Sequence, residues 1–311
     1  MNFPIFFDDK NTLNLFGLNK EFLFLSNLYK KNKLPKILLF TGNKGTGKST
    51  LINHFLYSIF DEKNYSKENL KLIHKSSFYN QFKNDIFTNI IIVKGSDFKS
   101  VKVDDIRNLK KKIFQSTILN KDRFIILDDI ELFNINSLNA LLKIIEEPGK
   151  NNYFFLINNK SKPLLETIKS RSLEVKIILN EKKRIEIINS LIDFFNLELI
   201  LDPVLSKLSP GNFVKFNHLF RELNISISDE LTKNLSILLT LYKKDKDILF
   251  IDLAFFIVNF YFKNINKKQN FKNNQIYEMR NFIFDNLNNF LLYNLNQNSV
   301  INTINNRFKY E

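Results

Sequence analysis

The 311-residue sequence contains no cysteine, which excludes disulfide bonds, thiol nucleophiles and cysteine-ligated zinc together. Only His54, His74 and His218 can supply an imidazole, and they are scattered along the chain without the spacing of metal ligands. We therefore expect no zinc. The absence of disulfides favours the cytoplasm as the setting of the protein.

Long apolar segments are also missing. The longest, residues 248–262, contains Asp252 and Asn259 and is too short and too polar to span a bilayer. The first ten residues lack the basic stretch and apolar core of a secretory signal. We therefore expect a cytoplasmic protein that does not bind a membrane.

Acidic residues are outnumbered by basic ones, with 32 Asp and Glu against 46 Lys and Arg, which gives a net charge of +14. Such an excess favours contact with nucleic-acid phosphates. However, the sequence is rich in Lys, Asn, Ile and Phe and has only 7 glycines, as a coding sequence biased toward A and T would produce. Both explanations of the charge remain open. Length and a hydrophobic content of 44% predict two or three globular domains.

The apolar residues up to about residue 175 form short continuous runs. Four such runs are residues 37–40, 89–93, 124–127 and 153–157. Continuous runs are typical of strands buried on both faces, which predicts an α/β fold with a parallel sheet covered by helices. Between the last two runs, apolar residues recur at helical spacing over residues 137–146, which predicts an amphipathic helix that ends before Pro148.

The rest of the sequence shows helical patterns. Residues 181–195, 204–208 and 213–223 are helix-like and are separated by Pro203 and by Ser209-Pro210-Gly211. From about residue 226, further helices rich in Phe follow, with polar breaks near residues 243–246 and 264–274. The Phe-rich faces favour helix packing over stacking on bases. We therefore predict an α/β domain at 1–175, a small helical domain at 176–224 and an all-α domain at 225–311.

Residues 42–49, Gly-Asn-Lys-Gly-Thr-Gly-Lys-Ser, match the phosphate-binding pattern G-x-x-x-x-G-K-[ST]. They lie between a predicted strand and a predicted amphipathic helix that runs to Phe60. Glycines let backbone N–H groups surround phosphates, the lysine reaches the β and γ oxygens, and the hydroxyl binds Mg²⁺. We predict a site for ATP or ADP that is formed by Gly42, Gly45, Thr46, Gly47, Lys48, Ser49 and Thr50.

Two carboxylates, Asp128 and Asp129, follow the apolar run 124–127. They would stand at the C-terminal end of a buried strand, where α/β sheets bind ligands. Asp128 is the expected partner of Ser49 at Mg²⁺, and Asp129 could polarise an attacking water weakly. The acidic pair alone is a weak signal, and its value comes from its combination with the phosphate-binding pattern of residues 42–49, the P-loop.

Four further segments carry motifs in a fixed order. Residues 139–148 are Asn-Ala-Leu-Leu-Lys-Ile-Ile-Glu-Glu-Pro, residues 103–107 are Val-Asp-Asp-Ile-Arg, and residues 167–172 are Thr-Ile-Lys-Ser-Arg-Ser. Leu34-Pro35 precedes the first apolar run. Over most of residues 15–175, these segments resemble the N-A-L-L-K-x-x-E-E-P, V-D-x-I-R and T-I-x-S-R-C motifs of bacterial clamp-loader subunits of the AAA+ class.

This resemblance implies an AAA+ module, a small helical lid and a C-terminal collar that joins a hetero-pentameric ring with the gamma/tau and delta subunits of DNA polymerase III. Such a ring loads the sliding clamp on primed DNA and consumes ATP. By the same resemblance, Arg171 is an arginine finger that acts in trans in the site of a neighbouring subunit. Asn158 or Asn159 occupies the sensor 1 position, and we favour Asn159 as the nucleotide ligand.

The sequence also departs from the family pattern. Asp129 stands where active motors carry Glu, Asn212 stands where a sensor 2 Arg is expected, and Ser172 replaces a Cys. The cysteine cluster of gamma/tau subunits is absent. These departures favour a subunit that binds nucleotide, hydrolyses it weakly or not at all, and lends Arg171 to its neighbour. The alternative is a gamma/tau-type motor that hydrolyses ATP in its own site, and an unrelated P-loop remodelling ATPase is a third, less favoured interpretation.

Overall fold

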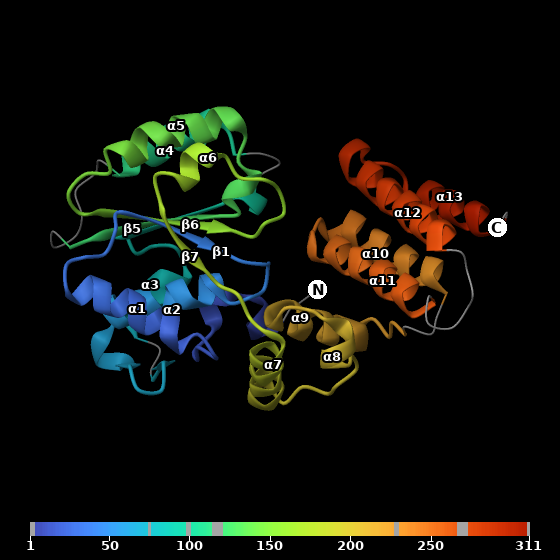
Figure 1. Cartoon of the computed structure of the whole chain (residues 1–311), viewed down its shortest axis with the longest axis horizontal. Coiled ribbons are helices and arrows are strands. Elements are labelled where there is room, and N and C mark those ends of the chain that lie inside the picture. Colours follow the sequence, from blue (N-terminus) through green and yellow to red (C-terminus); the bar gives the residue numbers. More distant parts are fainter. Residues whose placement is uncertain are drawn as a thin grey trace. The chain divides into compact units, whose positions relative to one another are not determined.

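The computed structural model describes residues 4–73, 76–97, 101–113, 121–226, 230–265 and 273–309 (Figure 1). The chain forms two compact units. The N-terminal unit extends to Glu198 and also contains Lys207–Lys215, whereas the C-terminal unit contains Leu199–Ser206 and the chain from Phe216 onward. His74 lies outside the described residues.

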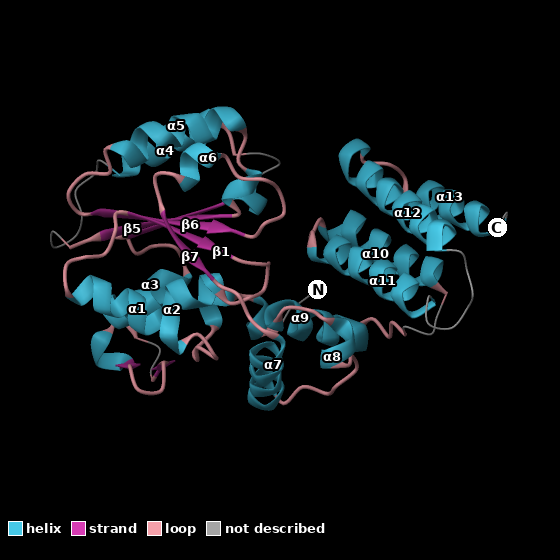
Figure 2. Cartoon of the chain, viewed as in Figure 1, coloured by secondary structure: helices cyan, strands magenta, loops and turns pink. Residues whose placement is uncertain are grey.

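A five-stranded parallel sheet forms the centre of the N-terminal unit (Figure 2). In spatial order, its strands are β4 (Ile90–Lys94), β5 (Arg123–Asp128), β6 (Asn152–Asn158), β1 (Ile37–Thr41) and β7 (Leu173–Lys176). Leu39 of β1 stands opposite Leu156 of β6 and Glu174 of β7. The four strands predicted from apolar runs are confirmed. The fifth, β7, has no such run because Val175 is its single buried residue.

Helices cover both faces of this sheet (Figure 1). One face carries α1 (Asn19–Lys30), α2 (Lys48–Phe60) and α3 (Ser77–Lys83), and the other carries α4 (Val103–Ile113), α5 (Ile135–Glu146) and α6 (Glu166–Lys169). Side-chain caps fix where α3 and α5 begin, because Ser76 accepts the N–H of Tyr79 and Asn134 accepts the N–H of Ser137. A two-stranded hairpin of β2 (Tyr65–Ser66) and β3 (Lys71–Leu72) contacts α2, and α7 (Glu181–Phe195) follows β7.

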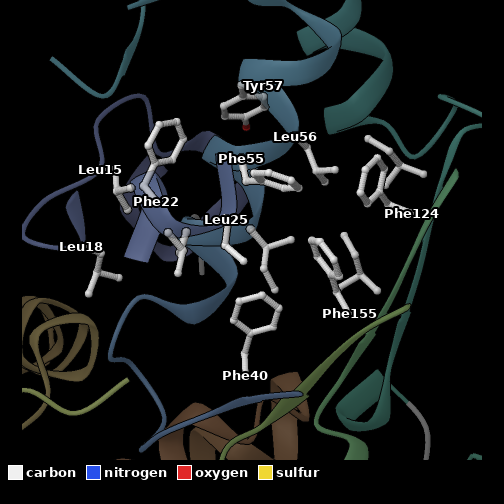
Figure 3. Packing of buried hydrophobic residues seen from close by; sticks show 14 of the residues in the cluster. Leu15, Leu18, Phe22, Leu25, Phe40, Phe55, Leu56, Tyr57, Phe124 and Phe155 are labelled. Atoms are coloured by element: carbon white, nitrogen blue, oxygen red, sulfur yellow. The ribbon is translucent and has the colours of Figure 1, made fainter. Parts of the chain in front are cut away.

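Alternate side chains of the central strands enter two separate hydrophobic clusters. On β5, Phe124 and Ile126 join the cluster that contains α1 and α2, whereas Ile125 and Leu127 join the cluster that contains α4 and α5. Figure 3 shows Phe124 in the first cluster, near Phe155 and the residues of α2. Burial of both faces explains why the strands appear in the sequence as continuous apolar runs.

The helix α2, which starts at the P-loop, has no exposed residue. Its predicted amphipathic character is therefore wrong. The sheet covers one side, while α1, the segment Asp9–Asn11 and the β2–β3 hairpin contact the others. Even the polar side chains of Asn53, His54 and Ser58 are buried. This helix is the centre of the cluster in Figure 3, where Phe55, Leu56 and Tyr57 are drawn.

The described part of the C-terminal unit is helical. It contains α8 (Pro203–Ser206), α10 (Leu231–Asp245), α11 (Leu249–Ile265), α12 (Asn273–Tyr293) and α13 (Gln297–Lys309), and it shares α9 (Pro210–Glu222) with the N-terminal unit. The predicted break near 243–246 covers the last turn of α10, and residues 246–248 separate α10 from α11. The predicted break at 264–274 includes residues 266–272, which lie outside the described residues.

Phenylalanines of this unit, including Phe220, Phe250 and Phe290, are buried between helices, as the sequence predicts. None of the helices in the described part of the chain is long and apolar enough to cross a membrane. The prediction of an α/β module with a parallel sheet, followed by helices, is confirmed.

Candidate functional site

The P-loop, residues 42–47, joins β1 to the first turn of α2. Gly47 is the N-cap of α2 and has a φ of +90°. Because glycine has no side chain to cap the helix, the first backbone N–H groups of α2 remain available to a ligand. Helix N-termini of this kind attract anions because the N–H groups and the helix dipole both favour negative charge. A Cβ on Gly42 would lie 2.5 Å from the carbonyl oxygen of Ile177, so a larger residue does not fit there.

The side chain of Lys48 folds back into the loop and binds its backbone. It is buried, and its Nζ donates hydrogen bonds to the carbonyl oxygens of Gly42 at 2.6 Å and Asn43 at 2.8 Å. Burial lowers the pKa of Lys48 to about 8, although nearby carboxylates, led by Asp128, act in the opposite direction. The ammonium group therefore lies inside the loop and binds two neutral carbonyl oxygens. An anionic phosphate oxygen would be a stronger acceptor and could replace them.

The acidic end of β5 lies beside this loop. The Oγ of Ser49 is 3.4 Å from the Oδ2 of Asp128, and the backbone N–H of Asp129 donates to the Oδ1 of Asp128 at 2.9 Å. A hydroxyl and carboxylates suit Mg²⁺, which prefers oxygen ligands. The described residues contain no group of three or more His, Cys, Asp or Glu side chains that could hold a metal ion. Ser49 and Asp128 would therefore hold Mg²⁺ only together with phosphate and water oxygens.

Two asparagines, the last residue of β6 and the residue that follows it, have different hydrogen-bond partners. The Nδ2 of Asn159 donates to the Oδ1 of Asp129 at 2.7 Å and lies 3.4 Å from the Oδ1 of Asp128. The Oδ1 of Asn158 instead accepts the backbone N–H of Lys160 at 2.9 Å. Asn159 is thus the asparagine that faces the acidic pair.

A cavity of about 330 Å³ opens beside the P-loop. One wall is polar and consists of P-loop residues with Asp128, Asp129 and Asn159. The other wall is apolar and comes from the N-terminal segment and α7: Phe6, Phe7, Phe16, Ile187, Leu191 and Phe195. A cavity with one polar and one apolar wall suits a ligand that combines phosphates with a flat apolar group.

The start of α9 touches the P-loop directly. The Oγ of Ser209 donates to the carbonyl oxygen of Lys44 at 2.6 Å, and the N–H of Gly211 donates to the carbonyl oxygen of Gly45 at 2.8 Å. A Cβ on Gly45 would lie 2.5 Å from the Oγ of Ser209, and the φ of Gly45 is +81°. Asn212, which stands at the sensor 2 position of the sequence motif, lines the cavity.

Arg171 does not line this cavity. Its Nε donates to the Oε1 of Glu146 at 2.9 Å, and its Nη1 donates to the carbonyl oxygen of Thr167 at 3.1 Å. The side chain is 40% exposed. Of the predicted site residues, all but Gly42 and Arg171 line the cavity. Gly42 accepts the hydrogen bond from Lys48 at the base of the loop, whereas Arg171 lies at the surface beyond the end of α5.

Sequence reasoning missed several residues of the site. The aromatic wall formed by Phe6, Phe7 and Phe195 comes from segments far apart in the sequence, and no motif marks it. Glu131, two residues after the acidic pair, is buried against the loop that carries Asn159. An acidic residue after a strand usually indicates a solvated turn, so its burial could not be predicted from its type.

Comparison with known proteins gives the following relationships. The family described as DNA polymerase III, delta subunit, matches residues 18–180. The chain is 29% identical over 147 residues to DNA polymerase III subunit delta′ of Buchnera aphidicola subsp. Baizongia pistaciae, covering 46% of this chain and 44% of that protein. It is 30% identical over 201 residues to the subunit delta′ of Buchnera aphidicola subsp. Schizaphis graminum, covering 61% of this chain and 60% of that protein.

A third relative is DNA polymerase III subunit tau/gamma of Haemophilus influenzae, with 26% identity over 156 residues, 48% of this chain and 21% of that protein. The first two alignments span about half the length of the relatives that they match.

Proposed function

We propose, from the premise that this chain belongs to the DNA polymerase III delta-subunit family, that it is a clamp-loader subunit of the delta-prime type. It binds ATP or ADP with Mg²⁺, hydrolyses it weakly or not at all, and lends Arg171 to the active site of a neighbouring subunit. It acts in the cytoplasm in a hetero-pentameric ring with gamma/tau and delta subunits, which loads the sliding clamp on primed DNA. Residues 1–175, 176–224 and 225–311 are its AAA+ module, lid and collar.

The surface position of Arg171 is the observation that carries this proposal. The guanidinium is held by Glu146 and by a backbone carbonyl, and it is not part of the cavity of its own chain. A guanidinium supplied by another subunit can neutralise charge on a transferring phosphoryl group. The P-loop, with the buried Lys48 and with Ser49 next to Asp128, supports nucleotide binding in the chain's own cavity.

A gamma/tau-type motor is the second candidate. The contact between Asn159 and Asp129 favours it, because the polar wall of the cavity then has both a carboxylate and an amide close to the P-loop. Against it, the carboxylate of Asp129 is one methylene shorter than a glutamate, and Asn212 supplies no positive charge where a sensor 2 Arg would stand.

Two variants separate these functions in a loader complex reconstituted with clamp and primed DNA. In the delta-prime role, Arg171→Ala should depress ATPase and clamp loading strongly, since loss of an arginine finger costs about 10³-fold or more at the site it serves. Lys48→Ala should abolish binding of a fluorescent ATP analogue to this chain and affect the complex more mildly. Lys169→Ala is the matched control, because Lys169 is a nearby cation that pairs with Glu166 at the surface.

The opposite pattern would establish the motor. If Lys48→Ala stops the complex while Arg171→Ala leaves it running, the chain hydrolyses ATP in its own site and the delta-prime role is wrong.

A further inference from the structure

Glu131 is a buried carboxylate that neither the sequence motifs nor the proposed chemistry uses. It lies in the 3₁₀ turn Ile130–Leu132 just after β5, and it is 5% exposed. Its Oε1 accepts three hydrogen bonds, from the backbone N–H of Asn159 at 3.0 Å, the backbone N–H of Ser161 at 3.2 Å and the Oγ of Ser161 at 2.8 Å. Its Oε2 is buried and has no hydrogen-bond partner among the described residues.

The three donors belong to one short loop, residues 159–161, at the end of β6. A carboxylate that accepts several donors holds them more firmly than a neutral acceptor, because charge-assisted hydrogen bonds are shorter and stronger. Removing Glu131 would leave the backbone N–H groups of Asn159 and Ser161 without this acceptor, which is costly unless water or a shift of the loop replaces it. Glu131 therefore fixes the backbone of Asn159.

The loop that Glu131 holds carries the amide that faces the acidic pair. The backbone N–H of Asn159 binds Glu131, and its side-chain Nδ2 binds Asp129. Both acceptors lie within residues 128–131, just at the end of β5. This segment therefore binds both the backbone and the side chain of Asn159. A side chain held at both its backbone and its amide is preorganised, and it loses little entropy when it meets a ligand.

We propose that Glu131 is a positioning residue that holds Asn159 where it distinguishes a nucleoside triphosphate from a diphosphate. This inference rests on the proposed nucleotide site and deepens it. The Nδ2 of Asn159 lies 3.4 Å from Asp128, and Asp128 lies next to Ser49, where Mg²⁺ would bridge the outer phosphates. The amide of Asn159 therefore suits the terminal phosphate. A diphosphate that fills the P-loop and the apolar wall would not need it.

The test measures the affinity of the full chain for ADP and for a non-hydrolysable ATP analogue, by displacement of a fluorescent nucleotide in the presence of Mg²⁺. Wild-type protein should prefer the triphosphate. Glu131→Ala should weaken triphosphate binding about tenfold and leave ADP binding within about twofold, since one preorganised hydrogen bond to a charged ligand is lost. Glu131→Gln should retain the preference for the triphosphate, because the amide oxygen of glutamine can accept hydrogen bonds from the same three donors.

Two further variants keep the test decisive. Ser161→Ala removes one donor of the three and should shift the ratio of affinities in the same direction by about threefold, even if Glu131→Ala folds poorly. Glu166→Ala, a surface carboxylate that pairs with Lys169, is the control and should change nothing.

The outcomes separate this inference from the proposed function. A merely structural role of Glu131 would weaken ADP and triphosphate binding equally, and that result would overturn the inference. A wild-type chain that binds both nucleotides equally well, or a ratio unchanged by both Glu131→Ala and Ser161→Ala, would overturn it too, while nucleotide binding stands. A wild-type chain that binds neither nucleotide would instead refute the proposed nucleotide site itself.

Discussion

Acidification should destabilise the N-terminal unit through His54, whose imidazole is fully buried in α2. Its Nε2 lies 3.1 Å from the carbonyl oxygen of Thr12 and its Nδ1 lies 3.0 Å from the hydroxyl of Tyr65. A carbonyl can only accept, so Nε2 carries the proton and Nδ1 accepts from Tyr65. Burial lowers the pKa of His54 from 6.5 to about 3, so the folded chain keeps the ring neutral.

The size of the effect follows from the difference between the folded and unfolded pKa values. Above pH 6.5, the ring is neutral in both states and contributes no pH dependence. Below pH 6.5, only the unfolded chain takes up the proton, so the free energy of unfolding falls by about 1.4 kcal/mol per pH unit until about pH 3. Between pH 7.5 and pH 5, His54 alone should therefore cost about 2 kcal/mol.

Urea unfolding at pH 7.5 and pH 5 measures this cost. Other groups also titrate in this range, so the quantity of interest is the loss in wild type minus the loss in His54→Gln, which keeps a donor for Thr12 and has no ring to protonate. His218→Gln serves as the histidine control, because His218 is only partly buried. Equal losses in wild type and His54→Gln would refute the reasoning. In NMR, the ring signals of His54 should stay unchanged down to about pH 5.

Three further predictions concern the site itself. Gly45→Ala should lower the free energy of unfolding by about 1–3 kcal/mol and weaken nucleotide binding, because the residue has a φ of +81° and a Cβ would collide with Ser209; an unchanged melting temperature would contradict the close contact between Gly45 and Ser209. Arg171→Lys should not rescue the Arg171→Ala defect in the loader complex, since an ammonium lacks the planar fork that contacts two phosphate oxygens; full activity would show that charge alone suffices. The isolated chain should hydrolyse ATP slowly because Asp129 and Asn212 leave water activation and phosphate sensing incomplete; a DNA-stimulated turnover near about 10 s⁻¹ would support the motor.

Local patterns were enough to predict four of the five strands and the loop that joins β1 to α2. Strands such as residues 124–127 are recognisable because burial on both faces demands an unbroken apolar run. The P-loop is recognisable because its backbone shape requires glycine at fixed positions. The position of Asp128 next to Ser49 then follows, because parallel strands end at the same edge of the sheet.

Contacts between distant segments could not be predicted in the same way. Ser209 meets Lys44 across 165 positions of the chain, and Glu131 meets Ser161 across 30. The strand β7 could not be recognised in the sequence, because Val175 is its one buried residue and it has no apolar run. Each of these features depends on how elements pack in three dimensions and not on the period of the residues within one element.

Because α2 is buried on every side, binding of a ligand at its N-terminus is coupled to the stability of the N-terminal unit. The helix that begins at the P-loop is also the interior of the N-terminal unit, so the loop cannot loosen far without disturbing the packing around Phe55 and Tyr57. Any ligand that binds only the folded loop, at a hundred times its dissociation constant, adds about 2.7 kcal/mol to the stability of the unit. The resistance of the chain to proteolysis would then rise and fall with the concentration of that ligand in the cell.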